Sequence, residues 1–150
     1  MSGHAGLVTA LPTATDRLRA PVREDAHGQP GRGGPGEWRD LAPEILRQRL
    51  VVEGVPARPI GAAQIRRYLS ALSREVGMVQ LLEPVTHRSD QYGWAGWIHW
   101  ETSGAHFYAW DAPRLFFSVD LYTCKAFDVD TAVSFTRDFF HAAPIVAKSF

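Results

Sequence analysis

The spacing of apolar residues becomes regular near residue 44 and then predicts a series of elements. Residues 45–55 form an apolar run that ends beside a glycine and a proline. This run predicts a strand, with a helix as the alternative for its first half. Apolar residues in 65–76 recur at helical spacing, while arginines occupy the other side. Gly77 is a typical stop for that helix.

Further along the chain, apolar and polar residues alternate, which is typical of strands. The pattern is clearest in residues 114–123, and residues 94–100 and 105–110 follow it as well. Residues 78–85 form a short apolar run that predicts another strand, followed by a polar loop up to residue 93.

The last part of the chain favours a helix and an edge strand. Asp130 is a residue type that caps helices. The apolar face of this helix is expected to comprise Ala132, Phe135, Phe139 and Phe140. Pro144 is expected to end the helix before a strand at 145–150. The order is then β-α-β-β-β-β-α-β, which predicts an α+β fold, an antiparallel sheet with helices packed on one face.

Residues 1–37 differ from the rest because they are rich in glycine, proline, alanine and arginine and have no sustained period. Such a segment cannot bury enough apolar surface to offset its chain entropy, so we predict a disordered N-terminal tail. Residues 38–150 are expected to form one domain.

Composition excludes several function classes. The 16 basic and 16 acidic residues balance, so nothing favours nucleic acid or an anionic membrane as a partner. No apolar run reaches the length of a membrane span. The single cysteine cannot form an internal disulfide and is typical of a reducing compartment. We therefore expect a cytoplasmic protein.

The turn residues Asp111 and Pro113 predict a hairpin between 105–110 and 114–123. If Asp111 and Arg114 flank its tip, Ser103 faces Tyr122 and Glu101 faces Cys124. Directly opposed residues lie roughly 5 Å apart, so the hydroxyl and the thiol meet at the open end of the hairpin. Together with His106, these side chains form a candidate reactive cluster of Glu101, Ser103, His106 and Cys124. The alternative is a bulge in a sheet with a buried cysteine.

These residues resemble the prokaryotic S-adenosylmethionine decarboxylase family of pyruvoyl-dependent enzymes. That family has a Glu-Ser-His cleavage site, a strand, a turn and a second strand close to Val-Asp-Val-Phe-Thr-Cys. The counterparts here are residues 101–104 and the stretch 119–124, which reads VDLYTC. The helix near 63–76 and the following Gly77 and Met78 also resemble the family, so the resemblance covers residues 45–150.

The resemblance implies a chemistry. The chain would cleave itself between Thr102 and Ser103 through an N-to-O acyl shift and elimination. Ser103 would then become a pyruvoyl cofactor that forms a Schiff base with the amine of a small-molecule substrate and serves as an electron sink for decarboxylation. Cys124 would be the proton donor. The implied reaction is decarboxylation of S-adenosylmethionine, which supplies the aminopropyl group for polyamines such as spermidine, and the implied assembly is a homodimer.

The sequence departs from the family pattern at several positions. Gly104 follows the serine where the family has histidine, and Tyr108 occupies the position of the processing histidine. Thr102 precedes the serine, with Glu101 one position earlier. His106 could replace the missing base, or it could be a half-exposed strand residue. The alternatives are therefore a pyruvoyl enzyme acting on another amino acid, such as ornithine or arginine, and an uncleaved homologue that binds a ligand or a partner subunit.

Overall fold

The computed structural model describes residues 39–150, and the tail predicted for residues 1–37 lies outside them. The chain divides into two units, of which Asp40–Phe150 contains all the regular elements described here. These elements are β1 (Gln48–Gly54), α1 (Ala62–Glu75), β2 (Val85–Ser89), β3 (Gly93–Trp100), β4 (Ser103–Trp110), β5 (Phe116–Thr123), α2 (Val129–Phe140) and β6 (Ile145–Ser149).

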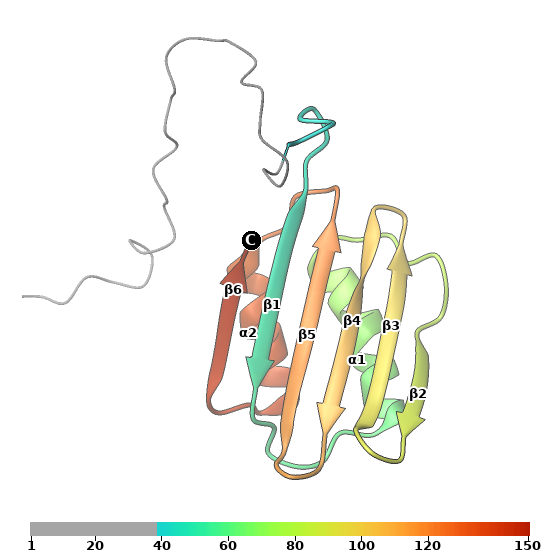
Figure 1. The fold of residues 1–150 in the computed structure, drawn as a ribbon, viewed down its shortest axis with the longest axis vertical. Coiled ribbons are helices and arrows are strands. Elements are labelled where there is room, and N and C mark those ends of the chain that lie inside the picture. The colour runs from blue at the N-terminus through green and yellow to red at the C-terminus, as the bar shows by residue number, and fades with distance from the viewer. Residues whose placement is uncertain (1–38) are drawn as a thin grey trace, which may run out of the picture. The chain divides into compact units, whose positions relative to one another are not determined.

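The six strands form one antiparallel sheet in the order β2-β3-β4-β5-β1-β6. Both helices lie behind the sheet in Figure 1 and cover one of its faces. The predicted α+β fold and the predicted edge strand at the C-terminus are therefore confirmed. Among residues 39–150, no helix is long and apolar enough to cross a bilayer.

The core lies between the sheet and the helices, with Tyr68 of α1 at its centre. Its ring lies 5.3 Å from that of Phe107 on β4 and 4.7 Å from that of Phe140 on α2. Its hydroxyl lies 2.7 Å from Thr136 Oγ1, so the buried phenol has a hydrogen-bond partner. Burial raises the pKa of Tyr68 well above its ordinary value, and the phenol stays neutral.

The alternation in β3 and β5 is the pattern the sequence predicts. Gly96, Ile98 and Trp100 point to the helices, while Trp97 and His99 between them are exposed. This happens because successive side chains of a strand point to opposite faces, and only one face of this sheet is covered.

The second strand of the prediction is wrong. Residues 78–84 form only an isolated bridge, between Gln80 and Trp100, and β2 instead begins at Val85 and continues through residues 86–89 of the predicted polar loop. The turn after β2 is short, and Ser89 Oγ accepts hydrogen bonds from the amides of Gln91 and Tyr92. This turn folds the polar segment back onto β3, where an edge strand needs no apolar run.

The element ends also differ from the prediction. β1 begins at Gln48, so residues 45–47 are neither strand nor helix. Asp128, not Asp130, caps α2, because its carboxylate accepts a 2.7 Å hydrogen bond from the Thr131 amide. Hydrogen bonding from the side chain of Thr131, and then from its amide, lowers the pKa of Asp128.

The end and the buried face of α2 need correction too. The helix ends at Phe140, where His141 adopts a left-handed conformation, rather than at Pro144. Its buried residues are Ala132, Thr136 and Phe140, and the predicted Phe135 and Phe139 are only partly buried against the core.

Gly96 sets how closely α1 approaches the sheet. A Cβ at this position would clash with Cγ2 of Ile65, which is fully buried on α1. We therefore expect Gly96→Ala to destabilise the fold by about 1–3 kcal/mol, the usual cost of overpacking. Urea unfolding of the wild type and the variant measures this difference.

A double-mutant cycle provides the control. Ile65→Ala removes the clashing methyl group, so Gly96→Ala should cost clearly less in that background than in the wild type. Strictly additive costs would contradict the proposed contact.

Candidate active site

The predicted cluster lies at one end of the sheet, around the hairpin between β3 and β4. The two-residue turn of Glu101 and Thr102 joins the strands, so Trp100 pairs with Ser103. On its other side, Ser103 pairs with Thr123 at the end of β5. Ser103 thus begins β4, which has a neighbouring strand on each side.

The register between β4 and β5 differs by one residue from the prediction. Ser103 faces Thr123 and Gly104 faces Tyr122, and Glu101 lies exposed in the turn instead of facing Cys124. The reason is the length of the connecting loop. Trp110 pairs with Phe116, so residues 111–115 form the connection rather than a tight turn at 112–113.

The predicted proximity of the hydroxyl and the thiol is found in the structure. Ser103 Oγ lies 3.8 Å from Cys124 Sγ, although the residues are 21 positions apart. Thr123 points into the core and is fully buried, so Cys124 points to the open side and its thiol is exposed. The cysteine is therefore accessible, which excludes the alternative of a buried one.

The backbone at Ser103 is strained. Its φ is 134°, a region that residues with a side chain rarely adopt. Strain of this kind persists only where the surrounding structure imposes it, and it occurs preferentially at functional sites. Here the peptide bond before the strained residue is the predicted Thr102–Ser103 cleavage site.

Hydrogen bonds fix both sides of that peptide bond. The Cys124 amide donates to the Thr102 carbonyl oxygen at 2.9 Å. The side chain of Thr102 lies in a buried chain in which Thr123 Oγ1 donates to Thr102 Oγ1 at 3.1 Å. Thr102 Oγ1 in turn donates to Met78 Sδ at 3.4 Å. The turn is thus anchored to β5 and to the segment after α1.

Two histidines lie near the serine on the open face. His106 lies two residues beyond Gly104, between Trp97 and Asp120 of the neighbouring strands, and is exposed. His99 pairs directly with Gly104 on β3 and is also exposed. Opposed residues lie about 5 Å apart, whereas two residues along a strand span about 6.6 Å. The backbone of His99 therefore lies nearer than that of His106 to Gly104, the residue that follows Ser103.

His99 is a candidate site residue that was not predicted from the sequence. The signal was available, because residues 94–100 alternate and His99 must lie on the face opposite Ile98. What was lacking was the pairing of β3 with β4, which depends on the two-residue turn at Glu101 and Thr102.

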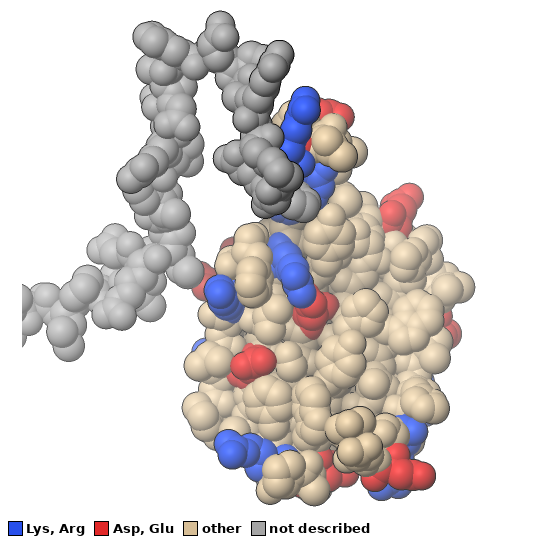
Figure 2. Space-filling view, in the orientation of Figure 1, with Lys and Arg blue, Asp and Glu red and all other residues tan. Residues whose placement is uncertain are grey.

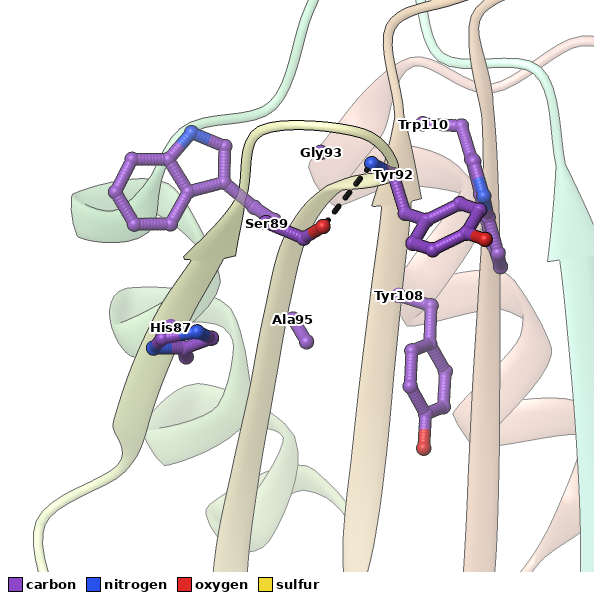
Figure 3. Close-up of a pocket in the computed structure, with 8 residues that line it drawn as sticks. His87, Ser89, Tyr92, Gly93, Ala95, Tyr108 and Trp110 are labelled. Carbon is purple, nitrogen blue, oxygen red and sulfur yellow. Dashed lines mark hydrogen bonds between the residues drawn. The ribbon is translucent and has the colours of Figure 1, made fainter.

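A cavity lies elsewhere on the open face, with a volume of about 320 Å³. Figure 3 shows Tyr108 and Trp110 on one side of it and His87 on the other, with Ala95 between them. Trp110 lies seven positions along β4 from Ser103, a distance of roughly 23 Å at 3.3 Å per residue. The cavity therefore does not belong to the Ser103 site of the same chain.

Comparisons with known proteins agree with the geometry. The family model for S-adenosylmethionine decarboxylase matches residues 54–150. The chain belongs to the S-adenosylmethionine decarboxylase family. No curated protein matches the chain.

The solved structures include a family member with the same fold. The structure resembles the adenosylmethionine decarboxylase from Aquifex aeolicus VF5, with a TM-score of 0.58 and 17% sequence identity. The similarity covers 71% of this chain and 89% of that one. S-adenosylmethionine decarboxylases are carboxy-lyases, and this family is generally pyruvoyl-dependent.

The residues of this S-adenosylmethionine decarboxylase family member fit that cofactor. A pyruvoyl group is made from a serine, and Ser103 combines a strained backbone with a carbonyl on its amino side that already accepts a hydrogen bond. Residues 39–150 contain no group of three or more His, Cys, Asp or Glu side chains that could hold a metal ion.

Proposed function

We propose that the chain cleaves itself between Thr102 and Ser103 and then decarboxylates S-adenosylmethionine. The observation that carries the proposal is the 3.8 Å distance between Ser103 Oγ and Cys124 Sγ. It gives one site both the precursor of the pyruvoyl group and an accessible proton donor.

Self-cleavage would begin with attack of Ser103 Oγ on the carbonyl carbon of Thr102. The C–N bond breaks as the hydroxyl proton passes to the nitrogen, which leaves an ester between Thr102 and the Ser103 side chain. Loss of the Cα proton of Ser103 then breaks the Cβ–Oγ bond and releases the Thr102 carboxylate. Water then hydrolyses the bond to the nitrogen of residue 103, and that nitrogen leaves as ammonia. A pyruvoyl group remains at the new amino terminus.

When present, that carbonyl supplies an electron sink for the loss of carbon dioxide. The role of the chain is to orient the substrate amine at residue 103 and to return a proton to the substrate carbon. We assign the proton to the Cys124 thiol, because it is accessible and near the former serine side chain. His106 and His99 are the candidates for the base that removes the Ser103 Cα proton.

The decisive experiment is mass spectrometry of the purified, denatured protein. We expect two fragments, the larger ending at Thr102 and the smaller beginning with a pyruvoyl group at position 103. Ser103→Ala should remain one chain, since it has no nucleophile. A Ser103→Ala protein still found in two pieces would indicate proteolysis.

Hydroxylamine adds a test of the base within the same experiment, because it cleaves an ester but not a peptide bond. His106→Gln should stall at the ester and yield fragments only when hydroxylamine is added. If His99→Gln behaves in this way and His106→Gln does not, His99 is the base.

The second candidate function is an uncleaved homologue that binds a ligand or a partner subunit. It is favoured by Gly104 and Tyr108, which occupy the positions where the family has histidines. A single intact wild-type chain that does not react with borohydride and an amine would support this candidate and contradict self-cleavage.

The role of Cys124 can be tested apart from cleavage. Cys124→Ala keeps the backbone amide, so cleavage should proceed, whereas release of carbon dioxide from S-adenosylmethionine should fall by about 10²–10⁴-fold, the usual contribution of a general acid. Cys124→Ser is the matched control and should retain more activity than alanine.

Wild-type activity of Cys124→Ala would exclude the thiol as the donor. Ornithine and arginine, offered as substrates in the same assay, separate the S-adenosylmethionine enzyme from one acting on another amino acid.

We further propose that the protein is a homodimer that pairs through part of the open face of the sheet. Figure 2 shows that this face carries few charged side chains. Its large apolar residues with 40–61% of their surface exposed are Val85, Trp97, Tyr108, Tyr122 and Val146. Exposed large apolar side chains on one sheet face are typical of an interface, and a twofold pairing uses the same patch on both subunits.

Sedimentation or light scattering should give about twice the 16.7 kDa chain mass. Tyr108→Asp places a charge in the middle of the face and should shift the protein to monomer. Ser134→Asp, on the exposed side of α2, is the control and should leave the mass unchanged. A wild-type monomer at micromolar concentration would contradict the dimer.

A further inference from the structure

We infer that Thr123 is a positioning residue for self-cleavage. Its hydroxyl holds the turn at Thr102 so that the Thr102 carbonyl, which is attacked in the first step, stays hydrogen-bonded to the Cys124 amide. The inference rests on the proposed function and adds to it a residue with no role in the chemistry described so far.

The Thr102 carbonyl is the atom group on which charge develops during the acyl shift. When Ser103 Oγ attacks, its oxygen becomes negatively charged, and a donor already in place stabilises that charge without reorganisation. The Cys124 amide is such a donor, at 2.9 Å from the oxygen. This bond lies one pair beyond the last pair of the β4–β5 ladder, where strand ends usually fray.

Thr123 is placed to keep that bond in position. Its hydroxyl accepts a hydrogen bond from the Lys125 amide at 3.0 Å and donates to Thr102 Oγ1 at 3.1 Å. It therefore joins the residue after Cys124 to the residue before Ser103. The Thr123 side chain is thus hydrogen-bonded on both sides of the hydrogen bond between the Cys124 amide and the Thr102 carbonyl.

The surroundings make this tie rigid. Thr123 is fully buried, and Met78, with 6% of its surface exposed, accepts the hydrogen bond of the Thr102 hydroxyl. The Lys125 ammonium donates to the Gly77 carbonyl at 2.7 Å, which fixes the same segment from its other side. A valine at position 123 would fill the same space without making either hydrogen bond, so packing alone does not require a threonine.

The contacts also agree with the strain at Ser103. A φ of 134° costs free energy that the neighbouring contacts must offset. The tie through Thr123 acts on the residue directly before the strained one. Release of that tie allows the turn to relax and moves the carbonyl away from its donor.

The test is the rate of self-cleavage of the full chain, made by cell-free synthesis and followed after synthesis is stopped. Thr123→Val removes the hydroxyl and should slow cleavage about 10-fold or more, less than the 10²–10³-fold typical of losing an oxyanion donor itself. Thr123→Ser keeps the hydroxyl and should cleave within about 3-fold of the wild type. Hydroxylamine should not accelerate Thr123→Val, because the slowed step precedes the ester.

Thr136→Val is the matched control. Thr136 is also fully buried, and its hydroxyl bonds to the Ala132 carbonyl at 2.7 Å, far from the cleavage site in the chain. The Thr136→Val variant loses the same kind of buried hydroxyl and should cleave itself at the wild-type rate. If Thr123→Val does not fold, Thr102→Val removes the same hydrogen bond from the half-buried turn and should show the same slowing.

The possible failures are distinguishable. If the wild type cleaves and Thr123→Val cleaves equally fast, this inference is wrong and the proposed function stands. The inference is also wrong if Thr136→Val slows as much, or if Thr123→Ser is as slow as Thr123→Val. A wild-type chain that stays intact overturns the proposed function and this inference with it.

Discussion

The pairing of β4 with β5 is the constraint on which the candidate site depends. Side chains of a strand alternate between faces, so a shift of one residue would turn Cys124 into the core and Thr123 to the outside. The observed register places the Thr123 side chain inside the core and leaves the Cys124 thiol exposed on the outside. The five-residue connection at 111–115 sets this register.

The sequence predicted much of this fold because one covered face leaves a clear signal. Residues 94–100 and 114–123 alternate since only every second side chain enters the core, and the proximity of Ser103 and Cys124 followed from one hairpin. The register did not follow, because it depends on the geometry of a loop rather than on hydrophobicity. β2 was missed for a different reason, as an edge strand with polar side chains has no apolar pattern to detect.

The two faces of the sheet carry different kinds of side chain. Tyr68 and its ring contacts fill the covered face, and Gly96 lets α1 approach closely. The other face carries the candidate site residues His99, His106 and Cys124, so these exposed side chains are kept apart from the groups that stabilise the fold. Changes on the open face can therefore alter reactivity with little effect on the core.

The strand order has a consequence for a chain cut before Ser103. The amino-terminal piece would hold β1, β2 and β3, and the carboxy-terminal piece β4, β5 and β6, so the pieces alternate across the sheet. Strand β1 of one piece is inserted between β5 and β6 of the other. Neither piece could leave without breaking ladders on both sides of a strand. The nicked protein would behave as an interlocked heterodimer, and once the pieces were separated by denaturant, reassembly would become a concentration-dependent, bimolecular reaction.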